Sequence, residues 1–172
     1  IEGKAHIAVH SMKDVPAKVN DGFLISSIMK REDPCDVFIS NSYKSIEEIS
    51  NGTIGSSSPR RQAMIKSLGK NINVIEMRGN INTRLKKLKN SNIDGIILAK
   101  AGLRRMEMDS LITQNLSVES FVPSPGQGVL CIECLSQHSE IMSKIKKIVH
   151  LNTEICVSAE RIFAAQMDGD CM

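Results

Sequence analysis

The order of apolar and polar positions predicts alternating strands and helices in the middle of the chain. Short apolar runs rich in Ile and Val alternate with segments whose apolar residues recur every three or four positions, as in buried strands and amphipathic helices. The predicted strands are 37–39, 53–55, 73–77 and 95–98, and the predicted helices are 45–50, 59–68 and 83–89. Repeated units of this kind indicate an α/β fold, with a doubly wound and mostly parallel sheet that has helices on both faces.

The same pattern extends to both ends of the chain. Further strands are predicted at 5–10, 23–29 and 129–134, and two amphipathic helices are predicted at 138–150 and 153–167. Helical turns are also predicted at 103–106 and 110–113. A charged stretch at 30–34 and a segment rich in Pro and Gly at 121–128 interrupt the pattern, and such segments are typical of domain boundaries.

Composition narrows the classes of function. Of the 172 residues, 41% are apolar and 24% charged, so the chain can bury a core and is not a disordered tail. A net charge of +3 and an aromatic content of 3% argue against a nucleic-acid-binding protein. No apolar run reaches the roughly 20 residues that a membrane span requires. Five cysteines without a framework spacing and without a secretory segment favour the cytoplasm.

A candidate anion site begins at the end of the strand 53–55. Ser58 is a suitable N-cap, Pro59 suits the first helical position, and Arg60 and Arg61 follow in the first turn. Free backbone N–H groups, hydroxyls and guanidinium groups would then meet at one point, which favours an anion. The alternative is a capped helix with two solvent-exposed arginines, because arginine in a first turn opposes the helix dipole.

Several other charged residues fall at similar positions. Ligands of open α/β sheets bind outside the carboxyl ends of the strands. Strand-end or early-helix positions are occupied by Lys13, Asp14, Arg60, Arg61, Arg78 and Arg84, and Arg104 and Arg105 follow the next strand. Together they suggest a cleft for a molecule with several carboxylates or phosphates, although each arginine taken singly is more often a surface residue.

The remaining Asp, Cys and His residues can be interpreted either as catalytic or metal-binding residues or as purely structural ones. A carboxylate at Asp14 could move a proton or stabilise a developing cation, or it could simply form a turn. The pair Cys131 and Cys134 lacks a second pair of ligands, and His6 and His10 lack a third ligand, so packing roles and no metal site are expected. By contrast, Cys171 follows a predicted helix in a loop where a thiol would be accessible.

Four segments in a fixed order resemble the porphobilinogen deaminase family, also called hydroxymethylbilane synthases. The resemblance covers all 172 residues, and its segments are 9–16 (VHSMKDVP), 56–62 (SSSPRRQ), 78–84 (RGNINTR) and 125–128 (PGQG). It implies a transferase of porphyrin and haem biosynthesis that joins four porphobilinogen molecules into the linear tetrapyrrole hydroxymethylbilane with release of ammonia. The alternative is a non-catalytic two-lobed module that binds small carboxylated anions.

The resemblance also implies a covalent dipyrromethane cofactor, held by a thioether to Cys171. The family's usual Gly-Gly-Cys is here Gly169-Asp170-Cys171. The implied catalytic residues are Asp14, as the acid that assists loss of the amino group, and Lys13. The implied cofactor-binding residues are Cys171, Lys13, Asp14, Ser57, Ser58, Arg60, Arg61 and Arg84, and the implied substrate-binding residues are Arg78, Arg84, Arg105, Ser11 and Gln127.

The family template divides the chain among three domains. Two domains of the periplasmic-binding-protein type are followed by a small α+β third domain. The template assigns 1–30 to the end of domain 1, 34–122 to domain 2, 129–147 to the return segment of domain 1 and 151–172 to the start of domain 3. We therefore expect a central fragment that is inactive alone, from a monomeric enzyme that acts on porphobilinogen and binds neither nucleic acid nor membrane.

Overall fold

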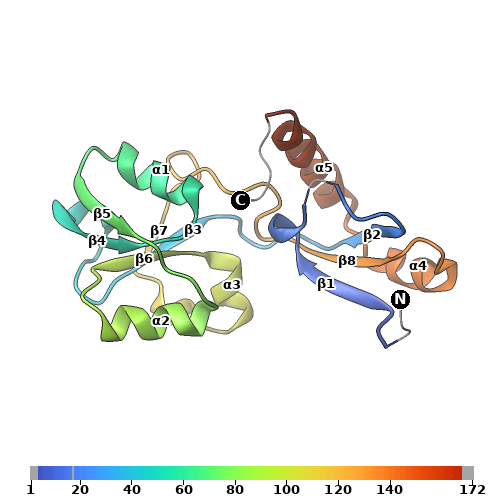
Figure 1. Ribbon diagram of the computed structural model, residues 1–172, viewed down its shortest axis with the longest axis horizontal. Coiled ribbons are helices and arrows are strands. Elements are labelled where there is room, and N and C mark those ends of the chain that lie inside the picture. Colours follow the sequence, from blue (N-terminus) through green and yellow to red (C-terminus); the bar gives the residue numbers. More distant parts are fainter. Residues whose placement is uncertain (1–3, 17, 168–172) are drawn as a thin grey trace. The chain divides into compact units, whose positions relative to one another are not determined.

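The computed structural model describes residues 4–16 and 18–167 (Figure 1). Their contacts divide the chain into two compact units. Unit 2 is the continuous segment Asp33–Pro123, and unit 1 consists of the described residues up to Glu32 together with those from Ser124 onward. Unit 2 is thus inserted in sequence between the two segments of unit 1.

Unit 2 contains a five-stranded sheet in the order β5-β4-β6-β3-β7. Its strands are β3 (Asp36–Ile39), β4 (Asn51–Gly55), β5 (Asn71–Ile75), β6 (Gly95–Ala99) and β7 (Gln114–Asn115). The sheet is mixed, because β4 is parallel to β5 and β6, whereas β3 is antiparallel to both β6 and β7. Residues 40–50 connect β3 to β4 and contain no α-helix, only the short 3-10 turn η2 (Ile46–Glu48), so the helical crossover typical of parallel strands is missing here.

Helices cover both faces of this sheet, as predicted (Figure 1). One apolar cluster joins the sheet to α2 (Ile81–Asn90) and α3 (Lys100–Arg105), and the other joins it to α1 (Pro59–Ser67). The alternation of β3 produces this division, because Val37 and Ile39 lie in the first cluster and Phe38 lies in the second. All three side chains are buried, so β3 is a central strand covered on both sides.

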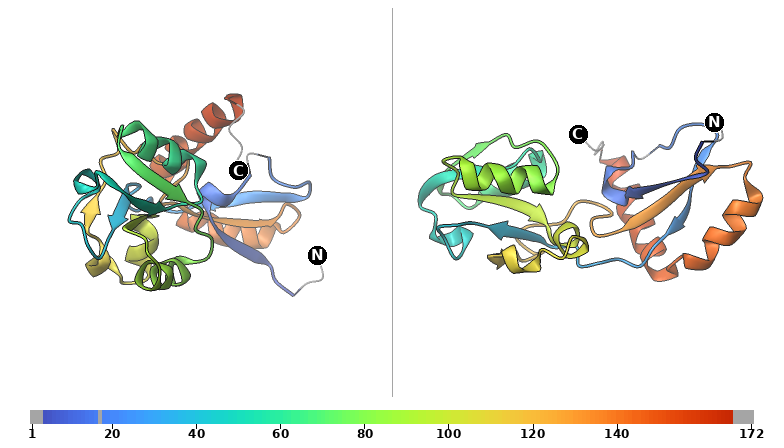
Figure 2. Two further views of the ribbon diagram at one scale, coloured as in Figure 1. Left: turned by 60° about the vertical axis from the view of Figure 1, so that its left-hand side comes forward. Right: turned by 90° about the horizontal axis from the view of Figure 1, so that it is seen from below.

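Unit 1 is built on an antiparallel sheet in the order β1-β8-β2 (Figure 2). Its strands are β1 (Ile7–Ser11), β2 (Phe23–Ile28) and β8 (Leu130–Leu135). The helix α4 (Ser139–Ile145) packs against β2 and β8, and α5 (Leu151–Gln166) contacts β2. Both Cys131 and Cys134 are buried in β8 as free thiols, which confirms their predicted packing role.

Several elements differ from the predictions. The predicted helix 45–50 is only the 3-10 turn η2, and α2 and α3 begin before the predicted residues 83 and 103. The strand β5 ends at Ile75, two residues earlier than predicted. The segment predicted as one helix over 138–150 is instead α4 followed by the 3-10 turn η4 (Lys146–Ile148). The turn η3 (Asp109–Leu111) ends before β7, a two-residue strand that the sequence pattern does not predict. None of the described helices is both long and apolar enough to cross a membrane.

Candidate functional site

The N-terminus of α1 carries the hydroxyls predicted to bind an anion. Ser58 is the N-cap, and its Oγ accepts a hydrogen bond from the backbone N–H of Arg61 at 3.4 Å. The neighbouring Ser57 Oγ accepts from the backbone N–H of Met77 at 2.9 Å. Both hydroxyls act as acceptors in these bonds, so each keeps its own hydrogen for an acceptor such as a carboxylate.

The two arginines of this turn are held by a buried carboxylate that sequence analysis missed. Asp36, at the start of β3, has no solvent exposure. Its Oδ1 accepts from Arg61 Nη2 and its Oδ2 from Arg60 Nη2, each at 2.7 Å. Burial by itself would raise the pKa of the Asp36 carboxyl, but the charges and hydrogen bonds of Arg61 and Arg60 outweigh burial and hold the pKa below its ordinary value.

Additional bonds fix the direction of both guanidinium groups. Arg61 Nη1 donates to the backbone carbonyl of Ile97 at 3.2 Å, and Arg60 Nη1 donates to that of Val122 at 2.5 Å. The Arg61 residue is only 5% exposed. The interpretation of two solvent-exposed arginines is therefore wrong, because both guanidinium groups pair with Asp36, and its negative charge offsets the unfavourable effect of their positive charges at the helix N-terminus.

Arg84 adds a third guanidinium to this edge of unit 2. It lies in the first turn of α2, whose N-cap Asn80 accepts from the backbone N–H of Thr83 at 2.9 Å. Burial and the charge of Arg61 lower the pKa of Arg84. Arg84 forms no ion pair with another described residue, and its Nε donates to the carbonyl of Gly79 at 2.8 Å.

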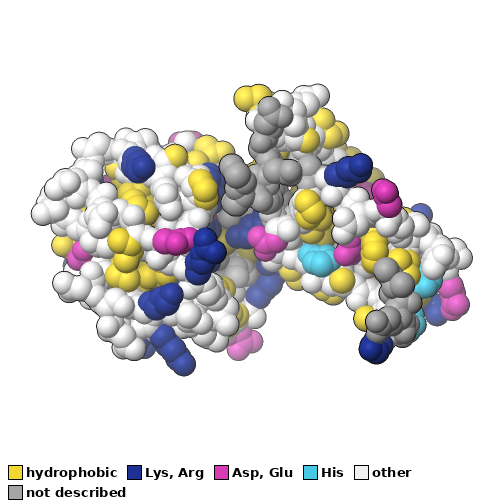
Figure 3. Space-filling model, viewed as in Figure 1, with side chains coloured by type: hydrophobic (Ala, Val, Ile, Leu, Met, Phe, Trp, Pro, Cys, Tyr) yellow, Lys and Arg dark blue, Asp and Glu magenta, His cyan; other side chains and the backbone are white. Residues whose placement is uncertain are grey.

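The result is an edge with excess positive charge. The parallel strands β4 and β5 end at the same edge of the sheet, and α1 and α2 begin there. The buried Asp36 carboxylate pairs with Arg60 and Arg61, and Arg84 lies at the same edge, so these four residues carry a formal charge of +2. Figure 3 shows further Lys and Arg side chains over α1 and α2. Helix N-termini and unbalanced guanidinium groups together favour a ligand with carboxylates.

The other predicted substrate residues of unit 2 lie on its surface. Arg78 is exposed and its Nε donates to Glu76 Oε1 at 2.7 Å. Arg105 is exposed at the end of α3. Their assignment to substrate stays a prediction.

In unit 1, the predicted catalytic pair lies in a 3-10 turn directly after β1. This turn, η1 (Met12–Asp14), follows Ser11 and places Asp14 in solvent and Lys13 half-buried. The buried Met12 anchors the turn, because its backbone N–H donates to the Val129 carbonyl at 2.9 Å. Asp14 is therefore an exposed carboxylate on a backbone turn that Met12 anchors.

The loop 125–128 packs against this turn. Gly126 has a φ of +70°, and a Cβ at this position would lie 2.8 Å from Met12 Cγ. Both observations require glycine there. The adjacent Gln127 is buried, and its carbonyl accepts from Arg31 Nε at 2.9 Å. Its predicted role in binding substrate stays a prediction.

Two neighbouring residues of α5 hold the turn and the loop together. Arg161 donates from Nη1 to the Val15 carbonyl at 2.9 Å and from Nη2 to the Pro16 carbonyl at 2.7 Å. Glu160 Oε2 accepts from the backbone N–H of Gly126 at 2.8 Å, and the Glu160 carboxylate is paired with Arg31. The helix thus fixes the chain immediately after Asp14 and the loop that supports it.

Two expectations are not settled by these contacts. Cys171 lies outside the described residues. The convergence of Lys13 and Asp14 with the arginines of unit 2 on one pocket stays a prediction.

Within the described ranges 4–16 and 18–167, no group of three or more His, Cys, Asp or Glu side chains is arranged to hold a metal ion.

Comparison with known proteins gives the family. Residues 1–143 match the family described as the porphobilinogen deaminase, dipyromethane cofactor binding domain. The chain belongs to the porphobilinogen deaminase family. Its relatives include the porphobilinogen deaminases of Francisella philomiragia, 46% identical over 99% of this chain, and of Ruthia magnifica, 43% identical over 99% of this chain. The chain covers 57% of the length of each of these two relatives.

The solved structures extend the comparison to the fold. A crystal structure of a Bacillus subtilis lipoprotein named for methionine binding matches with a TM-score of 0.51 and 12% identity, over 75% of this chain and 62% of that one. At this identity the likeness concerns the fold alone. The predicted α/β fold of the periplasmic-binding-protein type is confirmed.

Proposed function

We propose that the full-length protein is a hydroxymethylbilane synthase, a deaminating transferase that joins four porphobilinogen units and releases one ammonia at each addition. Membership of the porphobilinogen deaminase family carries this proposal. The positively charged edge of unit 2 supports it, because each pyrrole unit of the growing chain brings two carboxylates. In each addition, the bond between the aminomethyl carbon and its nitrogen breaks and the nitrogen leaves as ammonia. A carbon–carbon bond then forms to the α-carbon of the other pyrrole, and that carbon loses its proton.

The residues of unit 2 suit a dipyrromethane group. Its carboxylates would be held by the hydroxyls of Ser57 and Ser58 and by Arg60, Arg61 and Arg84. Asp36 bonds both Arg60 and Arg61 but brings only one negative charge against the three arginines, so two formal positive charges remain for carboxylates. When bound, the dipyrromethane supplies the pyrrole chain to which substrate units are added. We propose Cys171 as its point of attachment.

We propose that Asp14 assists the loss of ammonia and stabilises the cation that forms. A carboxylate is suited to both tasks, and the exposure of Asp14 leaves it available to substrate. Lys13, half-buried in the same turn, would bind a carboxylate. The contacts of Arg161 with Val15 and Pro16 would hold this turn in position.

The direct test replaces Asp14 in the full-length protein and measures hydroxymethylbilane formation from porphobilinogen. The matched control is Asp21→Asn, another exposed aspartate of unit 1. We expect Asp14→Asn to reduce kcat by about a hundredfold or more, the usual contribution of a positioned acid or base, and Asp21→Asn to be unaffected. Equal turnover by the two variants would remove Asp14 from its role.

The attachment of the cofactor is tested by intact-mass measurement of the full-length protein. Cys171→Ser should lack both the mass of the dipyrromethane and the activity. Cys156→Ser, which changes an exposed cysteine of α5, should retain both. An unmodified wild-type chain, or an active Cys171→Ser variant, would contradict the assignment.

The organisation of the full-length enzyme is also part of the proposal. We propose that unit 2 is domain 2 of the family template, spanning 34–122, that 1–30 and 129–147 belong to domain 1, and that α5 begins domain 3. We further propose a cytoplasmic monomer that binds neither nucleic acid nor membrane, and a 172-residue chain that is inactive alone. Measuring porphobilinogen consumption by the 172-residue chain beside the full-length protein tests the last point.

A further inference from the structure

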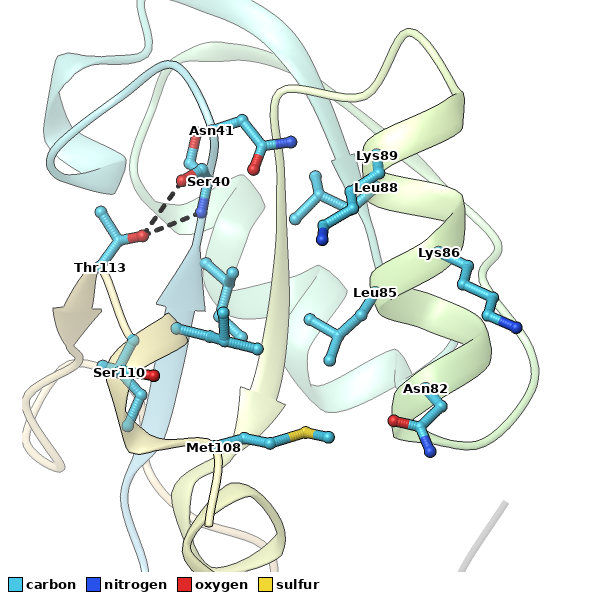
Figure 4. Close-up of a pocket in the computed structure, with 13 residues that line it drawn as sticks. Ser40, Asn41, Asn82, Leu85, Lys86, Leu88, Lys89, Met108, Ser110 and Thr113 are labelled. Carbon is cyan, nitrogen blue, oxygen red and sulfur yellow. Dashed lines mark hydrogen bonds between the residues drawn. The ribbon is translucent and has the colours of Figure 1, made fainter. Parts of the chain in front are cut away.

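A cavity lies in unit 2 that none of the clustered arginines lines (Figure 4). It has a volume of about 550 Å³ and opens between α2 and the segment that contains η3. This volume falls within the range of small-molecule sites in proteins. None of Ser57, Ser58, Arg60, Arg61 and Arg84 lines it, so the proposed function gives it no role.

The floor of the cavity is apolar. Leu85 and Leu88 approach it from α2, and Met108 and Ile112 approach it from the opposite side. In Figure 4, the side chains of Leu85 and Met108 point toward each other across the space. At its edge, Leu111 is 39% exposed, so apolar surface here remains in contact with water. A ligand that covered this surface would gain free energy from its removal from water.

The rim is polar and carries only positive charge. Lys86 and Lys89 line the cavity, and no acidic residue does. Figure 4 shows Lys89 directed over the space, with the amide of Asn41 nearby, whereas Lys86 points away. Within the described part of the chain, Lys89 has neither an ion pair nor a side-chain hydrogen bond. The helix α2 itself carries four basic residues and no acidic one, so no neighbouring residue of α2 neutralises Lys89.

We propose that this cavity binds a small organic carboxylate with a compact apolar body. The body would lie on Leu85, Met108 and Leu111, and the carboxylate would pair with Lys89 and accept a hydrogen bond from the Asn41 amide. The apolar floor favours a ligand with an apolar group, and the Lys89 ammonium favours a ligand with a negative charge. This proposal rests on the cavity alone and is independent of the proposed enzymatic function.

The experiment titrates the ¹⁵N-labelled full-length protein with 1-naphthoate and follows the amide chemical shifts. The uncharged analogue 1-naphthamide has a similar shape and controls for the carboxylate. We expect naphthoate to shift amides of residues 39–41, 82–89 and 108–113, and to bind at least about threefold more tightly than the amide, as one exposed ion pair allows. Shifts confined to the exposed apolar side chains of α5, or equal affinity for the two compounds, would overturn the proposal.

Matched variants test the contribution of the cation. Lys89→Glu should weaken naphthoate about fivefold, because attraction is replaced by repulsion. Lys66→Glu makes the same change on α1, at an exposed lysine on the other face of the sheet, and should leave the affinity unchanged. Both side chains are exposed, and the amide spectrum of each variant reports whether unit 2 remains folded. Equal affinities in the two variants would also overturn the proposal.

Discussion

Replacement of Asp36 by Asn should destabilise unit 2 more than any change to a surface ion pair. The carboxylate is fully buried, and Arg60 and Arg61 both donate to it at 2.7 Å. Asparagine keeps the shape of the side chain but removes its charge. The guanidinium of Arg61, itself 5% exposed, would then be buried without a counter-charge.

The expected size follows from what it costs to leave a buried charge unpaired. Removing one partner of a buried ion pair typically costs about 3–5 kcal/mol. Arg60 is more exposed than Arg61 and can be partly solvated, so we expect a loss near the lower end, about 3 kcal/mol. With a denaturant slope of about 2 kcal/mol per molar urea, the midpoint of unfolding should fall by about 1.5 M.

The chain offers a probe that reports on unit 2 alone. It contains one tyrosine and no tryptophan, and Tyr43 packs against the apolar cluster that contains Phe38. Tyrosine fluorescence during urea unfolding therefore follows unit 2. The control is Asp109→Asn, which removes an exposed partner of Arg104 in the same unit and should change the free energy of unfolding by less than about 0.5 kcal/mol.

The pH dependence provides a second measurement of the same interaction. Because the pKa of Asp36 is held below its ordinary value, its contribution is present above the unfolded-state pKa of about 3.9 and is lost as pH falls through the folded-state pKa. The difference in stability between wild type and Asp36→Asn should therefore shrink below about pH 4. A midpoint that falls by no more than in Asp109→Asn, or a difference that does not depend on acid pH, would refute this account.

Three smaller predictions concern other contacts. Burial would raise the pKa of Asp33, but the Lys100 ammonium and backbone hydrogen bonding lower it to about 2. NMR titration should therefore find this carboxyl charged at pH 3, and a titration midpoint near 4 would contradict the pairing with Lys100. Gly126→Ala should destabilise unit 1 by about 1–2 kcal/mol because of its positive φ, measured as faster amide exchange in β1 and β8, and unchanged exchange would disprove the constraint. Burial raises the pKa of the Cys131 thiol to about 11. At pH 8 the exposed Cys156 should therefore be alkylated well before Cys131, and equal labelling of the two in a peptide map would be inconsistent with the structure.

The local pattern of residues accounts for most of the elements. The apolar runs at 37–39 and 95–98 predict two central strands, and the structure buries both in β3 and β6. The strand β7 could not be found in this way, because its two residues are polar. It exists because flanking backbone groups bond to β3, with Thr113 donating to Phe38 and Leu116 to Asp36. Such pairing depends on tertiary structure.

In the candidate site too, features set by adjacent residues could be predicted, whereas contacts between residues distant in sequence could not. The hydroxyls and cap of α1 follow from a few adjacent residues, and Ser58 is indeed the N-cap. The partner of Arg60 and Arg61 lies more than twenty residues earlier, and no spacing rule connects them. The available sequence signal is that Asp36 directly precedes the apolar run 37–39, which predicts a buried strand, and a buried aspartate requires a counter-charge.

The insertion of unit 2 within unit 1 has a consequence for folding. During synthesis β1 must wait for β8, since Ile7 pairs with Cys134, whereas every strand of unit 2 emerges in between. The adjacency of β3 and β7 brings the early and late segments of unit 2 together, which shortens the effective loop that β1 and β8 must close. We therefore expect unit 2 to fold before β1 pairs with β8. A destabilising substitution in unit 2 would then slow this pairing even when the sequence of unit 1 is unchanged.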